Sequence, residues 1–168
     1  MSTHQTTVNN ATNGNKLPVS FYVLSDHKAE DFLGFISQLV QTALNKSNQS
    51  LLLLIDNESL LNELDEALWS QQAVSFIPHQ LLVASATAPA TDDLLAPVLL
   101  GDYLPSQFKG IVLNTTTRAV NDFMSTTSNT LPTRILEIIK PDTTSMQQGR
   151  EKYKRYQQLG YELTHFKV

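Results

Sequence analysis

The sequence predicts a three-layer α/β fold, in which a mostly parallel β-sheet is covered by helices on both faces. Short apolar segments alternate along the chain with longer segments whose apolar residues recur every three or four positions. Residues 51–55 (LLLLI) are uninterruptedly apolar, which is typical of a strand buried on both faces. The chain has 168 residues, which is long enough for one domain and short for two.

The N-terminal part of the chain predicts a tail, a strand and a helix. Residues 1–17 are polar and rich in Asn and Thr, so we expect a disordered tail before a single domain at residues 18–168. Residues 19–25 (VSFYVLS) are β-branched and aromatic, and predict the first strand. The next segment, SDHKAEDFLGFISQLVQTALNK, has the helical period, and Ser25 or Asp26 can cap its N-terminus.

The middle of the chain predicts a second helix between short strands. The helix NESLLNELDEALWSQ follows the apolar run and can be capped by Asp56 or Asn57. SFIPHQLL is expected to be a loop that leads to a short extended piece, and residues 86–97 a surface loop. Residues 97–102 and 110–116 are strand-like.

The C-terminal part predicts a strand, a helix and a terminal strand. RILEIIK is expected to be a strand of mixed exposure, and a helix follows over about residues 143–159. Thr144 and Gln147 have the spacing of a capping box, and Gly160 stands where a helix-ending glycine belongs. YELTHFKV is expected to be the last strand.

The sequence lacks the common catalytic and cofactor motifs. The turn after the first strand, LSDHKAED, has no glycine, so a Rossmann-like fold would lack its pyrophosphate-binding loop. There is no cysteine, no G-x-S-x-G motif and no pair of histidines at helical spacing. We expect His79 to form a hydrogen bond with the backbone in a loop, and Asp65 and Glu66 to lie on a solvated helix face. We therefore expect no catalytic site, no metal and no cofactor.

The charge is unevenly distributed along the chain. The net charge is −4, with six Lys/Arg against 13 Asp/Glu in residues 1–139 and six against three in residues 140–168. An acidic protein lacks the broad positive field of a general nucleic-acid binder, whereas a small basic patch suits a small acidic partner. No segment predicts a signal peptide or a membrane span, so we expect a cytoplasmic protein.

The basic patch is the stretch REKYKRYQQLGY at residues 150–161. On a helix, residues three and four apart share a face, which here carries Arg150, Tyr153, Lys154 and Gln157. A tyrosine ring between two cations suits a peptide that has carboxylates and an aromatic side chain. Lys152 and Arg155 point elsewhere and are expected to be solvated. The alternative is that the whole run is a solvated helix face.

A second unusual stretch is LDEALWSQQAVSFIPH, which contains the single tryptophan, Trp69, and Phe76 seven residues later. Aromatic residues at a helix end and in a proline-containing loop are usually core, but they can also be exposed interface anchors. Spacing alone does not choose between these two interpretations.

LDEALW with SFIPH, together with REKYKRYQQLGYEL and the opening SFYVLSD, resembles the chi subunit family of bacterial DNA polymerase III, an accessory of the clamp-loader complex. The resemblance covers roughly residues 19–168. It implies a three-layer α/β fold that binds no known nucleotide and has no known catalytic activity.

The resemblance also implies two protein partners. One surface would bind the acidic C-terminal tail of single-stranded DNA-binding protein, which ends in Pro-Phe. Another would bind the psi subunit, and in some bacteria an XPD-type helicase competes for that second surface.

The resemblance carries over to particular residues. Arg150 would pair with the terminal carboxylate or an Asp of the tail, Lys154 would add charge, and Tyr153 would wall the pocket for the terminal Phe. The family can have a lysine one turn before this arginine, where the present chain has Met146. The electrostatic part of tail binding is then weaker, or is supplied by another residue such as Lys152.

Trp69 and Phe76 match the family's aromatic pair at the psi- or helicase-binding surface. Nucleic acid would be contacted only indirectly, and no membrane is implied. Two alternatives remain open from the residues themselves. One is a Rossmann-like small-molecule enzyme, against which the missing glycines argue. The other is single-stranded nucleic-acid binding through the basic, tyrosine-bearing helix, against which the net charge argues.

Overall fold

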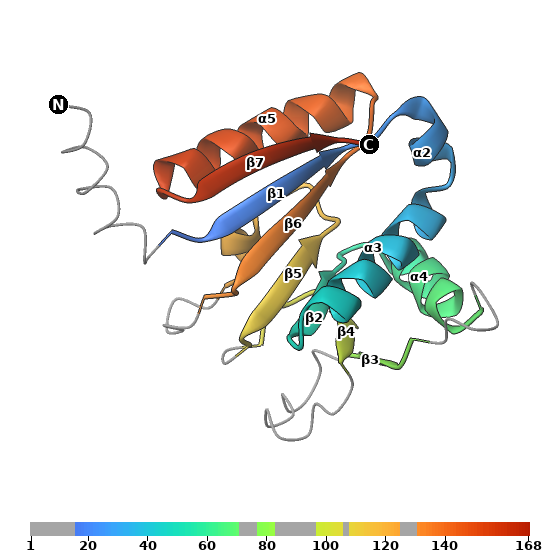
Figure 1. The fold of residues 1–168 in the computed structure, drawn as a ribbon. Coiled ribbons are helices and arrows are strands. Elements are labelled where there is room, and N and C mark those ends of the chain that lie inside the picture. Colours follow the sequence, from blue (N-terminus) through green and yellow to red (C-terminus); the bar gives the residue numbers. More distant parts are fainter. Residues whose placement is uncertain (1–15, 71–76, 83–96, 106–107, 125–130) are drawn as a thin grey trace, which may run out of the picture.

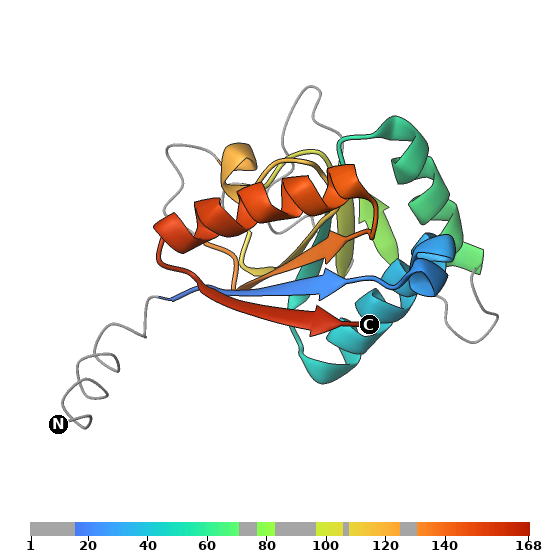
Figure 2. The same ribbon diagram turned by 90° about the horizontal axis from the view of Figure 1, so that it is seen from above.

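The computed structural model describes residues 16–70, 77–82, 97–105, 108–124 and 131–168 (Figure 1). In these residues seven strands form one sheet in the order β3-β4-β2-β5-β6-β1-β7, and every neighbouring pair is parallel. The α5 helix covers one face, and α3 and α4 cover the other (Figure 2). The predicted three-layer α/β fold is confirmed.

The strands are β1 (Pro18–Val23), β2 (Ser50–Leu54), β3 (His79–Leu81), β4 (Val98–Gly101), β5 (Gly110–Asn114), β6 (Arg134–Ile139) and β7 (Glu162–Lys167). The helices are α2 (Asp26–Glu30), α3 (Phe32–Lys46), α4 (Glu58–Ser70), α5 (Thr143–Gln158) and the short 3-10 helix η2 (Val120–Phe123). Strands and helices thus occur where the alternating pattern predicts them. No described helix has the length and apolar character needed to cross a membrane.

The core lies on both faces of the sheet because the central strands carry apolar side chains on both sides. In β2 the side chains alternate, so that Leu51 and Leu53 pack with α3 and α4 while Leu52 and Leu54 pack on the side of α5. Leu17, just before β1, is also buried in the core. Two-sided burial of β2 explains why its sequence is a continuous apolar run.

The helix predicted after β1 is divided in two at Asp31. This residue has φ −112° and ψ 58°, and its carboxylate accepts a hydrogen bond from the Gly34 amide at 3.2 Å, so it caps α3. Ser25 caps α2, and Asn57 caps α4 by accepting from the Leu60 amide at 3.0 Å. Periodicity alone could not show the break, because the apolar positions begin only after it.

The predicted capping box at Thr144 and Gln147 is wrong. Asp142 caps α5 instead: its carboxylate accepts a hydrogen bond from the Ser145 amide at 2.8 Å, and this bond lowers the pKa of the carboxyl below its usual value. Gly160 does end the helix, with φ 81°. Residues 1–15 of the expected tail, and nearly all of the loop expected at residues 86–97, lie outside the described residues.

Candidate functional site

The α5 helix presents one side to the sheet and another to solvent. Gly149, Lys152 and Tyr156 are buried against the sheet. A Cβ at residue 149 would lie 2.5 Å from the Ile139 side chain, so glycine lets the helix approach β6 closely. This close approach fixes the orientation of the helix and therefore decides which of its basic residues face solvent.

The outward side carries the predicted binding residues. Arg150 and Lys154 are exposed, and Tyr153 is half-buried. The Tyr153 ring centroid lies 5.7 Å from that of Phe21 in β1 and 5.1 Å from that of His165 in β7. The structure therefore brings two exposed cations and a partly exposed ring together beside β7, the strand at the edge of the sheet; the Arg150 guanidinium also donates to the Gln147 side chain at 3.4 Å. We call Arg150, Tyr153 and Lys154 the α5 face.

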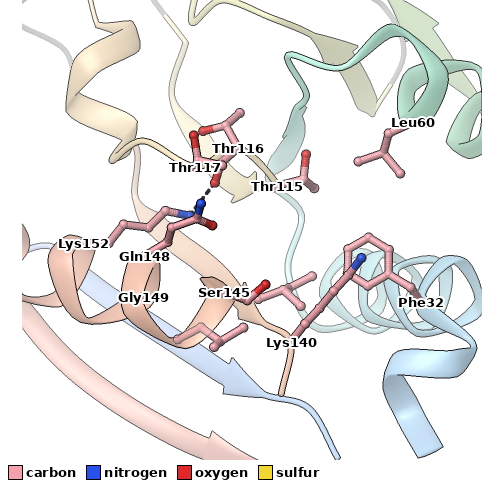
Figure 3. Close-up of a pocket in the computed structure, with 12 residues that line it drawn as sticks. Phe32, Leu60, Thr115, Thr116, Thr117, Lys140, Ser145, Gln148, Gly149 and Lys152 are labelled. Carbon is pink, nitrogen blue, oxygen red and sulfur yellow. Dashed lines mark hydrogen bonds between the residues drawn. The ribbon is translucent and has the colours of Figure 1, made fainter. Parts of the chain in front are cut away.

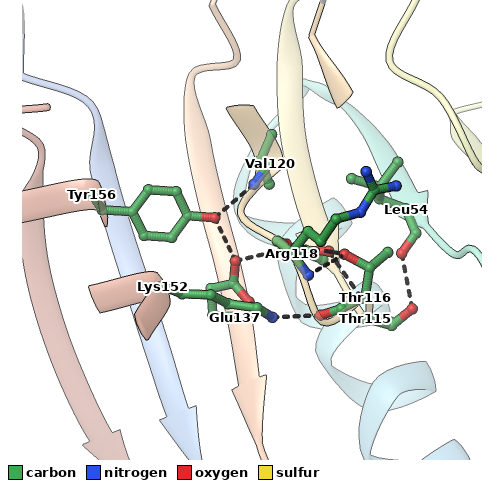
Figure 4. A network of polar contacts seen from close by, with 9 residues as sticks. Leu54, Thr115, Thr116, Arg118, Val120, Glu137, Lys152 and Tyr156 are labelled. Atoms are coloured by element: carbon green, nitrogen blue, oxygen red, sulfur yellow. Dashed lines mark hydrogen bonds and ion pairs between the residues drawn. The ribbon is translucent and has the colours of Figure 1, made fainter. Parts of the chain in front are cut away.

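Lys152 does not belong to that face, and its predicted solvation is wrong. Its side chain is 8% exposed, and its Nζ lies 2.8 Å from Glu137 Oε1 in β6 and donates to the Thr116 carbonyl at 2.5 Å (Figure 4). It therefore does not replace the family lysine at Met146. Met146 itself is exposed, so the α5 face extends one turn back without a charge. Arg155 is half-exposed and pairs with Asp122 at 3.1 Å.

Glu137 is the centre of a buried polar network that fastens α5 to the sheet (Figure 4). Its Oε2 accepts hydrogen bonds from the Tyr156 hydroxyl at 2.6 Å and from the Asn114 amide at 2.8 Å. The Tyr156 hydroxyl in turn accepts from the Val120 amide at 2.9 Å. Burial, and secondly the Glu137 carboxylate, raise the pKa of Tyr156 far above its ordinary value. The network positions the helix, and its members are buried.

The sequence interpretation missed this network. One signal was the glutamate inside the otherwise apolar strand RILEIIK, since a charge is seldom buried without a partner. Another was the spacing of Lys152 and Tyr156, which are four residues apart and so lie on one side of the helix. Together these two signals predict an ion pair between the strand glutamate and the inward-facing lysine.

The aromatic stretch is only partly described. Trp69 lies in the last turn of α4, but its side chain is not described, and Phe76 lies outside the described residues. His79, in the same stretch, has two described contacts: its Nδ1 is 2.8 Å from the Ile77 carbonyl oxygen, and its Nε2 is 2.6 Å from Asp65 Oδ1. The backbone contact predicted for His79 is confirmed. The Asp65 side chain is 34% exposed and its contact with His79 links α4 to β3, so it is only partly solvated, whereas Glu66 is exposed as predicted.

The described residues contain no group of three His, Asp or Glu side chains that could hold a metal ion. The chemistry available at the α5 face is binding: two cations and a ring can hold a carboxylate-bearing peptide through charge-assisted hydrogen bonds and apolar contact.

Comparison with known proteins identifies the family. Residues 18–164 match the family model described as the DNA polymerase III chi subunit, HolC. The DNA polymerase III subunit chi of Pseudomonas aeruginosa is 30% identical over 146 residues, which cover 86% of this chain and 92% of the relative. The subunit chi of Escherichia coli is 28% identical over 147 residues, covering 86% and 93%. The chain therefore belongs to the chi subunit family of DNA polymerase III.

Proposed function

We propose that this protein is a non-catalytic accessory subunit of the DNA polymerase III holoenzyme in DNA replication. It would bridge the acidic C-terminal tail of single-stranded DNA-binding protein to the psi subunit and the clamp loader. The observation that carries the proposal is the α5 face, where Arg150 and Lys154 are exposed beside the half-buried ring of Tyr153. Such a role would place the protein in the bacterial cytoplasm.

The tail would bind over the α5 face, beside β7. Arg150 would pair with the terminal carboxylate or an Asp, Lys154 would attract the acidic part, and Tyr153 would contact the terminal Phe. His165 packs on the Tyr153 ring, so the apolar wall has support from β7 as well as from α5. Since Lys152 is paired inside the protein, the electrostatic attraction rests on Arg150 and Lys154.

The second surface would be formed by Trp69 and Phe76 and would bind psi or an XPD-type helicase. Support for this part comes from family membership and from the position of Trp69 in the last turn of α4. On the sheet, α4 and α5 lie on opposite faces (Figure 2), so the two partners would approach from different sides.

The test is fluorescence anisotropy with a labelled acidic peptide that ends in Pro-Phe. We expect binding with a Kd of about 1 μM, equivalent to roughly −8 kcal/mol. Arg150→Ala should weaken it by roughly 1.5–3 kcal/mol, because a charge-assisted hydrogen bond is lost. Arg134→Ala is the matched control, since Arg134 is exposed and bonds Ser20 elsewhere on the sheet.

The salt dependence separates this mechanism from simple apolar contact. Affinity for the peptide should fall as ionic strength rises, because the paired charges are exposed. Equal peptide affinity of the parent and Arg150→Ala would refute the assignment of the α5 face. Tight binding of a bare oligonucleotide by the parent would instead favour direct nucleic-acid binding.

A further inference from the structure

The connections that follow the strands leave the sheet toward different faces. After β2 the chain passes into α4, which packs on one face, whereas after β5 it passes into η2 and after β6 into α5, which pack on the other. In open α/β sheets, a crevice forms beyond the carboxyl ends of the strands where neighbouring connections diverge in this way. Proteins of this architecture commonly bind their ligands in such a crevice.

A pocket of about 200 Å³ occupies this position (Figure 3). Its walls come from the threonine segment after β5, the end of β6, the first three turns of α5, and the helices α3 and α4. Phe32 and Leu60 supply apolar surface, while Thr117, Lys140 and Gln148 supply polar groups. The pocket lies at the start of α5, and its lining contains none of the three residues of the α5 face.

Some of the polar groups that line the pocket are already engaged inside the protein. The Thr115 hydroxyl donates to the Leu54 carbonyl at 2.8 Å, and the Ser145 hydroxyl donates to Asp142 at 2.8 Å. The Lys152 charge is balanced by Glu137. Because Asp142 caps the N-terminus of α5, the amide groups at that terminus do not themselves form an anion site.

Three groups remain available to a ligand. The Lys140 ammonium lies 4.1 Å from the centre of the Phe32 ring, and no described carboxylate forms an ion pair with it. The Gln148 amide and the Thr117 hydroxyl have no hydrogen-bond partner in the described part of the chain. All three line one cavity together with an aromatic ring. A cation and two uncharged donors beside apolar surface fit a small organic anion.

We propose that this pocket binds a small phosphate monoester, with the phosphate at Lys140, Gln148 and Thr117 and a compact organic part against Phe32 and Leu60. A single phosphate requires only these side-chain donors, whereas a pyrophosphate would require the glycine-rich turn that the chain lacks. The volume suits a mononucleotide fragment better than a dinucleotide. One cation, with the Asp142 carboxylate nearby, makes the site weak, so we expect a Kd of about 1 mM.

The test is a titration of the full-length, ¹⁵N-labelled protein followed by ¹H–¹⁵N correlation spectra. The probes are adenosine monophosphate, adenosine and inorganic phosphate. We expect saturable shifts of the Thr117, Lys140 and Gln148 amides with the monophosphate, weaker shifts with inorganic phosphate, and none with adenosine. Lys140→Gln should weaken binding of the monophosphate about tenfold. Lys46→Gln, which removes an exposed lysine at the end of α3, should leave it unchanged.

Two results would overturn the proposal. One is shifts that stay linear with the monophosphate or are equal with adenosine, and the other is undiminished affinity in both Lys140→Gln and Gln148→Ala. The acidic tail peptide serves as an independent probe in the same samples. Its affinity should be the same with and without the monophosphate, because its site is the α5 face, so failure of one site is distinguishable from failure of the other.

Discussion

Lys152 Nζ lies 2.8 Å from Glu137 Oε1, with the glutamate side chain 0% exposed. Two residues later, Lys154 is exposed. The basic run of α5 therefore contains lysines of two kinds, one that fastens the helix to β6 and one that faces solvent. Their substitutions should separate stability from binding.

Lys152→Met should destabilise the protein by roughly 3–5 kcal/mol, because it leaves the Glu137 carboxylate buried without its counter-charge. Urea unfolding followed by circular dichroism measures the loss. Adding Glu137→Gln should recover part of it, since the amide carries no charge and can still bond Asn114 and Tyr156. A single Lys152→Met variant as stable as the parent would contradict the buried pair.

Lys154→Met should leave the free energy of unfolding within about 0.5 kcal/mol of the parent, since the side chain is exposed. It should weaken binding of the acidic tail peptide and reduce the dependence of that binding on salt, because one cation is removed. Anisotropy titrations at two ionic strengths measure both effects. If the salt dependence were unchanged, Lys154 would not contribute to the interaction.

Tyr156→Phe should cost about 1–3 kcal/mol, because it leaves the buried Val120 amide without its acceptor and removes a donor from Glu137. Chemical unfolding of the variant gives the value. Tyr103→Phe is the matched control, since the Tyr103 hydroxyl has no hydrogen-bond partner among the described residues. Equal losses in the two variants would indicate a general effect of the missing hydroxyl rather than loss of the network.

Stability should also fall in alkali on account of Tyr156. The pKa of this hydroxyl is raised in the folded state, so its contribution is complete below the pKa of an unfolded tyrosine, about 10, and is lost as pH rises above it. The unfolded chain releases a proton that the folded chain keeps. The free energy of unfolding should therefore decline more steeply above about pH 10 in the parent than in Tyr156→Phe. Identical slopes would show that Tyr156 ionises as readily when folded.

The sequence predicted the elements well because the patterns that define them are local. The apolar run before Asp56 and the glycine after α5 each mark an element without reference to the rest of the chain. The α5 face could be proposed for the same reason, since helical spacing groups its residues. The burial of Lys152 does not follow from helical spacing alone, because it depends on Glu137, which lies 15 residues earlier in β6.

The turn between α5 and β7 tests whether glycine is required at the position where the sequence pattern predicts the end of the helix. Gly160 has φ 81°, a conformation that costs a residue with a Cβ about 1 kcal/mol. A Cβ at this position would meet no atom within 4 Å, so the cost of Gly160→Ala should be that of the backbone alone. Gly160→Asn should cost less, because asparagine tolerates the left-handed region. Thermal unfolding of both variants measures the difference. Equal stability of the parent and the alanine variant would mean that the turn can relax to a negative φ, in which case β7 could shift without loss.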